Sequence, residues 1–268
     1  MGIDLQKRIE GPEEPEVRMT FGEHLEELRS RLFKSILALL LTIVGCMFFY
    51  QPLVGFITRP HFKAMQLLNI APAESKFLSA TYTGPVVSMM MLTFIIGIFA
   101  ASPVIAYQIW AFISAGLYKN ERKYVLAFAP VSFALFCVGC FCGYIYLVPL
   151  ALYSLAKMLD LAIVSPQYSF SEYLSLVMKL TIMLGAIFQM PLIMVFLSKI
   201  GLIAPPTYHK WRRAAVMFNV VFAALITPAD VMTMLLVMIP LLLLYEVGVI
   251  ASYIFARPPK PAAPAPKP

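Results

Sequence analysis

The residues best placed to do chemistry are two carboxylates that flank long apolar segments. Glu27 stands just before the first apolar segment, in the sequence HLEELR, and Glu121 stands between the second and third, in YKNER. The simplest interpretation is that Glu27 forms a surface ion pair with Arg31, which is worth about 0–1 kcal/mol. Glu121 would pair likewise with Arg122 or Lys123. Alternatively, the two carboxylates form a site for a cationic ligand, because each can accept two hydrogen bonds from one guanidinium group.

Three polar side chains fall inside the apolar segments, where ionisable groups are costly and usually functional. Glu246 lies in the C-terminal half of the last segment, and we expect it to face other helices or a wet cavity, either protonated or paired. Lys179 lies near the start of the fourth segment, and its long stem can carry the charge to the membrane surface. Gln189 precedes Pro191, which removes a backbone donor. The Gln189 amide would either bind the freed carbonyl or contact a partner helix, and both interpretations stay open.

The sequence predicts neither a metal site nor a catalytic centre. The four cysteines are Cys46, Cys137, Cys140 and Cys142. All lie in apolar segments with no neighbouring His or carboxylate to complete a zinc site, so we interpret them as small packing residues of membrane helices. The three histidines are His24, His61 and His209, in three different connections. We therefore expect no enzyme activity and no cofactor.

The composition identifies a membrane protein. Hydrophobic residues make up 60% of the chain, the mean hydropathy is +0.81, and only 13% of residues are charged. A soluble domain carries roughly 25% charged residues, so this chain has too few charges to solvate a globular surface. The first 30 residues are polar and acidic rather than a cleavable signal peptide. We expect the first apolar segment to be retained as a helix.

We predict an all-α integral membrane protein with six transmembrane helices within residues 20–255. The spans are expected at 32–50, 85–110, 124–147, 173–197, 214–226 and 231–255. Residues 51–84 and 148–171 are expected to be connections. The last two spans are expected to be short. The fifth reaches only about 20 Å against a hydrocarbon core of roughly 30 Å, so either the membrane thins locally or its boundaries extend by a few residues.

The two ends of the chain are expected to be tails outside this membrane domain. Residues 1–19 are charged and rich in Glu and Pro, which predicts disorder. Residues 20–31 are expected to form an amphipathic helix on the cytosolic membrane surface that then turns into the first span, since Thr20 and Glu23 form a capping box. Leu25, Leu28 and Leu32 recur at helical spacing. Residues 256–268 contain mainly Pro, Ala and Lys and predict a flexible tail.

The distribution of Lys and Arg predicts the orientation. One side of the predicted membrane carries 16 of the 21, in residues 1–34, in the loops after the second and fourth spans, and in the C-terminal tail. The opposite loops carry Arg59, Lys63, Lys76 and Lys157. The positive-inside rule therefore places both termini in the cytosol. The same charges are spread over four segments as topological signals, so the net charge of +7 does not indicate nucleic-acid binding.

Six motifs, in order, resemble those of one known family. They are HLEELRSRL (24–32), SPVIAYQIWAF (102–112), GLYKNER (116–122), FQMP (188–191), LITPAD (225–230) and YEVG (245–248). Together, on six spans with this orientation, they resemble TatC, the multi-spanning core subunit of the twin-arginine protein translocase. The resemblance covers nearly all of the chain outside its tails.

The resemblance implies roles for particular residues. Glu27 and Glu121 match the acidic residues that recognise the arginine pair of a signal peptide. Other positions that match ones important for that surface or for the fold are Arg29, Pro60, Pro103 and Phe112. The positions that match a docking cluster for single-span partner subunits are Gln189 and Thr227, with Met234 where Gln is frequent in the family. Asp230 matches the acidic residue of the outer turn, and Glu246 lies in the motif of the sixth span.

The implied function is that of a membrane receptor that binds the twin-arginine signal peptides of folded proteins. The family exports these proteins across the bacterial inner membrane using the proton-motive force. The expected partners are those peptides, single-span subunits of the TatA and TatB type, further copies of the chain and the lipid bilayer. The main alternative is a small secondary transporter or channel, which needs ionisable residues converging near the bilayer midplane. A scaffold that never touches substrate would tolerate loss of Glu27 and Glu121.

Overall fold

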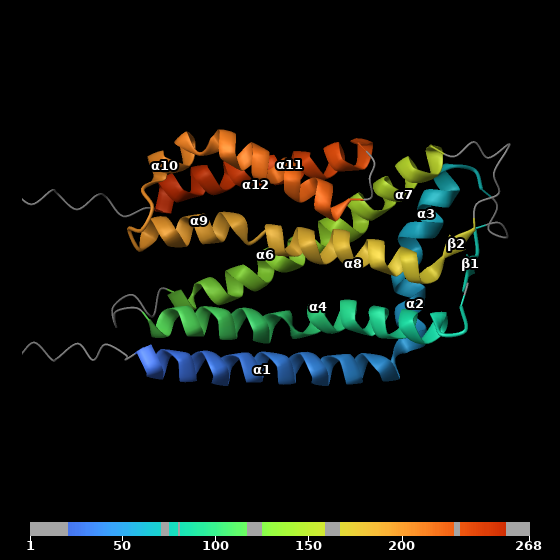
Figure 1. Cartoon of the computed structure of the whole chain (residues 1–268), viewed down its shortest axis with the longest axis horizontal. Coiled ribbons are helices and arrows are strands. Elements are labelled where there is room, and N and C mark those ends of the chain that lie inside the picture. Colours follow the sequence, from blue (N-terminus) through green and yellow to red (C-terminus); the bar gives the residue numbers. More distant parts are fainter. Residues whose placement is uncertain are drawn as a thin grey trace, which may run out of the picture.

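Long apolar helices run side by side and give the protein its shape (Figure 1). The computed structural model describes residues 21–70, 75–79, 81–116, 125–158, 167–227 and 231–255. The longer helices are α1 (Phe21–Phe48), α4 (Gly84–Ala115), α6 (Phe128–Cys142), α8 (Phe170–Ile187), α9 (Met190–Lys199), α11 (Arg212–Ile226) and α12 (Val231–Phe255). The shorter elements are α2 (Tyr50–Ile57), α3 (Arg59–Leu67), the π-helix η2 (Gly143–Leu147), α7 (Val148–Lys157), α10 (Pro205–Lys210), β1 (Phe77–Leu78) and β2 (Tyr168–Ser169). The prediction of an all-helical membrane architecture is confirmed in outline.

Five stretches of the described chain are long and apolar enough to cross a membrane. They are Gly22–Phe48, Gly84–Ala115, Phe128–Lys157, Phe170–Lys199 and Val231–Phe255. The expected fifth span is α11, which has 15 residues and reaches only about 22 Å. The expectation that the last two spans are both short is therefore wrong for α12, whose 25 residues reach about 38 Å.

The first helix differs from the expected surface helix and turn. Residues 21–48 form one uninterrupted helix, so the amphipathic N-terminal segment continues straight into the first span. No Pro or Gly occurs between residues 23 and 44, so nothing in the sequence ends the helix where the apolar segment begins. Leu25, Leu28 and Leu32 are exposed, whereas His24, Glu27 and Arg31 face α4.

Two expected connections contain helices. Residues 51–84 were expected to be a polar loop, yet α2 and α3 occupy 50–57 and 59–67, because Ile57, Ala64 and Met65 bury apolar side chains against the rest of the fold. Residues 148–157 continue the third span as α7. The π-helix η2 immediately precedes it, and such a bulge lets the helix run past Pro149, which lacks a backbone donor.

Two further prolines affect their helices in different ways. Pro103 lies inside α4 and leaves the carbonyl of Phe99 without its usual backbone donor. The hydroxyl of Ser102 donates to that carbonyl oxygen at 2.6 Å and so replaces the missing bond. Pro191 is the second residue of α9, which begins after a two-residue break at the end of α8, within the single span expected at 173–197.

Small residues let the helices approach closely, as is usual in membrane bundles. A Cβ atom on Gly139 of α6 would lie 2.8 Å from the Cα atom of Gly185 in α8, and one on Gly185 would lie 2.6 Å from the Cys140 sulfur. Gly97 of α4 similarly faces Ile43 of α1, and Thr42 donates to the Gly97 carbonyl at 3.0 Å. Cys140 is thus a packing residue, as predicted.

A small cap closes one end of the molecule. Strands β1 and β2 pair in parallel, with Phe77 opposite Tyr168. His61 of α3 is 1% exposed beneath them, and its Nε2–H donates to the Ser75 carbonyl at 2.9 Å. Aromatic rings of both strands and of Tyr173 surround the imidazole. The cap ties α3 to α8 at the end opposite the N-terminus of α1 (Figure 1).

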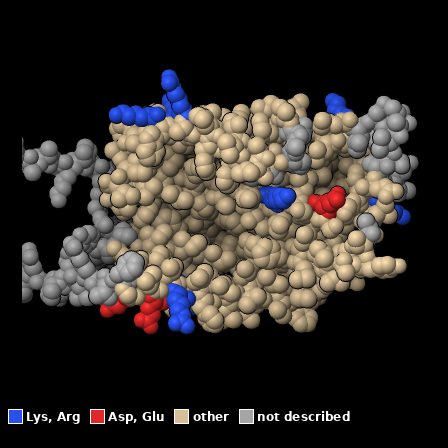
Figure 2. Space-filling model, in the orientation of Figure 1, with Lys and Arg blue, Asp and Glu red and all other residues tan. Residues whose placement is uncertain are grey.

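Charged side chains are sparse on the long faces of the helices. In Figure 2 they lie mostly toward the two ends, and the broad middle is covered by uncharged side chains with an acidic and a basic exception. Many exposed side chains are large and apolar, such as Phe33, Leu41 and Phe141. Continuous apolar surface of this extent fits contact with hydrocarbon rather than with water.

Candidate functional site

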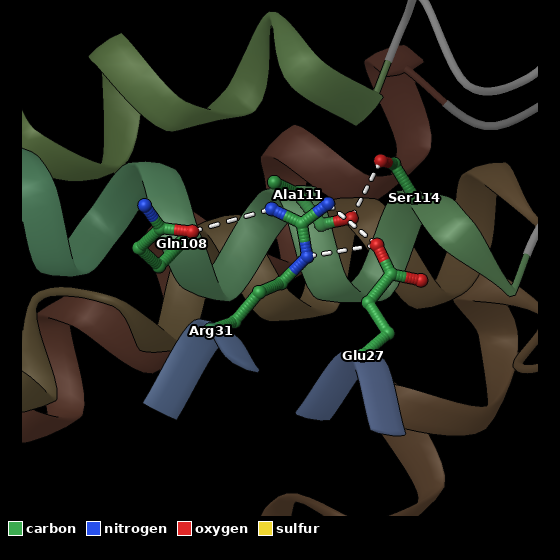
Figure 3. Close-up of polar contacts among 5 residues, drawn as sticks. All are labelled: Glu27, Arg31, Gln108, Ala111 and Ser114. Atoms are coloured by element: carbon green, nitrogen blue, oxygen red, sulfur yellow. Dashed lines mark hydrogen bonds and ion pairs between the residues drawn. The ribbon is translucent and has the colours of Figure 1, made fainter. Parts of the chain in front are cut away.

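The carboxylate of Glu27 lies on the side of α1 that faces α4 (Figure 3). Its side chain is only 16% exposed. The guanidinium of Arg31, one turn later, donates to Glu27 Oε1 from Nε at 2.9 Å and from Nη2 at 2.5 Å. The ion pair expected from the four-residue spacing is therefore present.

Arg31 also joins the two helices. Its Nη1 donates to Oε1 of Gln108 in α4 at 3.2 Å, across 77 residues of sequence. Figure 3 shows the guanidinium lying between Glu27 and Gln108 beside the Ala111 and Ser114 turn of α4. A guanidinium with donors on several edges suits this bridging position, because its fork geometry is fixed.

The second oxygen of Glu27 has no such partner. Glu27 Oε2 is buried and accepts no hydrogen bond within the described residues, and Nδ1 of His24 is in the same situation. The His24 ring stacks on Phe112 of α4, with ring centroids 4.5 Å apart and 19° between the planes. A buried acceptor without a donor costs free energy, so Glu27 Oε2 is a ready position for a donor from outside the chain.

A shallow hollow of about 350 Å³ opens at this carboxylate. It is lined by Glu23, Glu26, Glu27, Ser30, Arg31 and Lys34. Three carboxylates and two cations leave the hollow with a net negative formal charge. A cationic group of a ligand would be attracted to it, and a bidentate contact would favour a guanidinium over an ammonium.

Glu246 has a partner, which was one of the two states expected for it. Its Oε2 accepts a hydrogen bond from Nη2 of Arg212 at 2.6 Å, joining α12 to the start of α11. Both side chains are almost half exposed, at 44% and 47%. This ion pair joins the first residue of α11 to the C-terminal half of α12, and Figure 1 shows the start of α11 at the same end of the molecule as the N-terminus of α1.

Gln189 uses its amide between helices. Its Oε1 accepts from the Ser132 hydroxyl at 2.7 Å, and its Nε2 donates to the Ser132 carbonyl at 3.0 Å. Of the two interpretations left open by the sequence, contact with a neighbouring helix is the observed one. That neighbour is α6 of the same chain.

Comparison with known proteins decides the family. A family model for Sec-independent protein translocase protein (TatC) matches residues 23–240. The chain belongs to the TatC family. It is 35% identical over 235 residues to Sec-independent protein translocase protein TatCy of Bacillus subtilis (strain 168), covering 88% of this chain and 89% of the relative. It is 32% identical over 246 residues to Sec-independent protein translocase protein TatC of Aquifex aeolicus (strain VF5), covering 90% and 98%.

A solved structure agrees with this assignment. The crystal structure of the twin-arginine translocase receptor TatC matches the fold with a TM-score of 0.76 at 32% identity, covering 88% of this chain and 100% of that one. Membership of the TatC family makes the chain a component of a membrane protein translocase. The predictions of the family, of a role in protein transport and of a protein that is not an enzyme are confirmed.

The structure brings together only part of the predicted TatC recognition surface. Phe112 lies beside Glu27 through its stack on His24, and Arg29 is exposed on the same turn of α1. Pro103 is exposed within α4. Pro60 is buried in α3 at the opposite end of the molecule, so its place is in the cap (Figure 1).

Glu121 lies outside the described residues. Before that gap, α4 ends at Ala115 and Gly116 is its C-cap. A Cβ atom on Gly116 would lie 3.5 Å from Cε1 of His24, so the segment that carries Glu121 starts beside the Glu27 site. Sequence reasoning missed Gln108 and His24. His24 precedes Glu27 by three residues, and side chains at this spacing lie on the same face of a helix. This spacing could have predicted that His24 lies beside Glu27.

The predicted TatC partner-docking residues do not form one polar cluster in this chain. Thr227 is 8% exposed and donates to the Ala223 carbonyl at 2.9 Å. Met234 packs against the largest apolar core, and Gln189 is engaged with Ser132. Asp230 lies outside the described residues. The polar groups of Gln189 and Thr227 are therefore already engaged in hydrogen bonds within the chain.

Proposed function

We propose that the chain is the receptor and core subunit of a twin-arginine translocase. It binds the twin-arginine signal peptides of folded proteins and helps to export them across the bacterial inner membrane, driven by the proton-motive force. The solved relative is described as a twin-arginine translocase receptor, which supports this role. Glu27 and Glu121 each receive one arginine of the pair, and His24, Phe112 and Arg29 border the Glu27 site.

A single observation carries the proposal. Glu27 presents a buried carboxylate oxygen without a donor, at the rim of an acidic hollow. Each hydrogen bond from a guanidinium to a carboxylate is about twice as strong as one between neutral groups, and an ammonium cannot reproduce the planar bidentate geometry. The site therefore favours arginine over lysine by geometry as well as by charge.

The proposed topology has six spans with both termini in the cytosol. The short α11 is the fifth span, and in the view of Figure 1 both α11 and α12 stop short of the end that carries α3 and the strands. A bilayer around α11, whose 15 residues reach only about 22 Å, would thin locally to match it. The exposed residues of α11, together with Asp230, Gln189, Thr227 and Met234, are the region where single-span TatA- and TatB-type partners dock.

The secondary-transporter alternative lacks support from the ionisable groups. Glu246 pairs with Arg212 toward one end of the helices, and Gln189 pairs with Ser132. A transporter of small solutes needs such groups to converge on one site near the midplane.

Binding of a fluorescent signal peptide to the full chain in lipid nanodiscs tests the proposal. We expect an Arg-Arg peptide to bind wild type, and Glu27→Gln or Glu121→Gln to weaken it by at least about tenfold, the size of one hydrogen bond to a charged group. A Lys-Lys peptide should bind wild type poorly. Equal affinities for the three proteins would contradict the assigned site, provided that each variant elutes as wild type on gel filtration.

A further inference from the structure

The carboxylate assigned to the peptide is already held by a guanidinium of the same chain. Arg31 places both Nε and Nη2 on Glu27 Oε1, at 2.9 and 2.5 Å, while its Nη1 is held by Gln108 (Figure 3). An incoming arginine would use the same kind of donors on the same group. A bidentate contact needs both carboxylate oxygens, but Arg31 occupies one of them.

We propose that Arg31 is an internal competitor for the arginine of the signal peptide, and that the peptide must displace it from Glu27. This inference rests on the proposed function. Without a peptide, Arg31 occupies the position on Glu27 that the peptide's arginine would take. On binding, the peptide guanidinium takes both oxygens of Glu27, and Arg31 gives up Nε and Nη2 while Gln108 keeps its Nη1.

The Glu27–Arg31 pair is suited to such an exchange. Both side chains line the acidic hollow and keep part of their surface exposed, 16% for Glu27 and 18% for Arg31, so a ligand can approach the pair. A bidentate peptide guanidinium restores the two hydrogen bonds that Arg31 gives up, one on Oε1 and one on Oε2. The peptide gains the contact with Oε2, which is buried without a partner.

Competition of this kind sharpens the choice of arginine over lysine. A lysine ammonium is a compact charge and cannot place two donors of a rigid fork on a carboxylate. A lysine peptide would therefore have to remove Arg31 and would recover fewer hydrogen bonds than it broke. Displacing Arg31 from Glu27 costs free energy that an Arg-Arg peptide recovers in its own hydrogen bonds and a Lys-Lys peptide does not. Specificity then arises partly from the cost placed on the wrong ligand.

Lys34 provides a matched control. It lines the same hollow one turn further along α1 and carries the same charge. Within the described structure, Glu27 forms its ion pair with Arg31 and not with Lys34. Lys34→Gln therefore removes a positive charge from this surface and leaves the competitor in place.

The test measures the affinities of an Arg-Arg and a Lys-Lys signal peptide for nanodisc-embedded wild type, Arg31→Gln, Arg31→Lys and Lys34→Gln at one ionic strength. We expect Arg31→Gln to bind the Arg-Arg peptide up to about fivefold more tightly, the equivalent of one exposed ion pair. The Lys-Lys peptide should gain more, so the ratio between the peptides falls. Arg31→Lys keeps the charge but loses the fork, and should lower the ratio as well. Lys34→Gln should tighten both peptides equally and leave the ratio unchanged.

Two results would overturn the competitor role. One is weaker binding of the Arg-Arg peptide to Arg31→Gln, because Arg31 would then support the site. The other is a peptide ratio in both Arg31 variants that equals that of wild type. Failure of the proposed function looks different: Glu27→Gln would then bind both peptides as wild type does, whatever the Arg31 variants show. Arg31→Lys keeps the test open if Arg31→Gln does not fold.

Discussion

His61 is a buried histidine whose surroundings disfavour its charge. It is 1% exposed among aromatic rings of the cap, and its Nε2–H donates to the Ser75 carbonyl. Burial lowers the pKa of His61, and the hydrogen bond to Ser75 opposes that shift in part. The neutral ring is therefore the form that the folded cap holds.

Acid should destabilise the cap through His61. Because its pKa is lower in the folded chain, the unfolded chain takes up a proton first as the pH falls through about 6.5. The contribution of His61 to the free energy of unfolding is therefore complete above about pH 6.5 and decreases below it. We expect the thermal unfolding midpoint in detergent to fall between pH 7 and 5. His61→Gln should unfold at a lower temperature throughout but lose most of that pH dependence, and an unchanged slope in this variant would assign the effect to another group.

At the scale of single residues, sequence reasoning reached only local contacts. The four-residue spacing predicted the pair of Glu27 and Arg31, because side chains at that distance share a helix face. Gln108 lies 77 residues from Arg31, and only the packing of α1 on α4 brings them together. Likewise, Gln189 finds Ser132 across a helix contact that its own sequence neighbourhood does not specify.

Among the helices, α4 shows how a span tolerates a central proline. Pro103 cannot donate to the Phe99 carbonyl, and the Ser102 hydroxyl fills that position at 2.6 Å. The helix therefore continues from Gly84 to Ala115 and places Gln108 and Phe112 opposite α1. Ser102 thus replaces the hydrogen bond that Pro103 removes, in the part of α4 that leads to Gln108 and Phe112.

A double-mutant cycle measures that cooperation. In the presence of Pro103, Ser102→Ala should lower the free energy of unfolding by about 1 kcal/mol, because the Phe99 carbonyl loses its donor. In a Pro103→Ala background the new backbone amide supplies a donor, so the same change should cost much less. Equal costs in both backgrounds, measured by denaturation in mixed detergent, would show that the two residues are not coupled.

The elements themselves were predictable where hydrophobicity is continuous and not where chain direction changes. Long apolar blocks predicted the spans, because few other structures satisfy the backbone in hydrocarbon. The amphipathic start of α1 was separated from its span because its polarity changes, although its backbone has no reason to stop. The helices α2 and α3 were missed because their short apolar stripes are interrupted by Pro52 and Pro60, and prolines within a run predict a loop.

The whole molecule has two unlike ends. One carries the N-terminus of α1, the Glu27 site and the pair of Arg212 with Glu246, and the other carries the cap around His61 (Figure 1). The count of Lys and Arg predicts that the first end faces the cytosol. The proposed receptor role requires the same orientation, because signal peptides reach the membrane from the cytosol and the Glu27 site must face them.

Cysteine labelling tests that orientation. In a background with the native cysteines replaced, Tyr82→Cys and Leu202→Cys place thiols at exposed positions on opposite ends. A membrane-impermeant maleimide should label position 82 in right-side-out spheroplasts, and position 202 only after the membrane is permeabilised. The reverse pattern would place the Glu27 site on the wrong side for a receptor.

Photocrosslinking in membranes tests most directly the claim that Glu27 receives an arginine of the signal peptide. A photoreactive residue replaces either Leu28, exposed next to Glu27, or Leu78, exposed in the cap. We predict that an Arg-Arg signal peptide crosslinks from position 28 and not from position 78. That crosslink should disappear with a Lys-Lys peptide and with Glu27→Gln. Crosslinking from position 28 that is equally strong in all three cases, or that occurs mainly from position 78, would contradict the assigned receptor site.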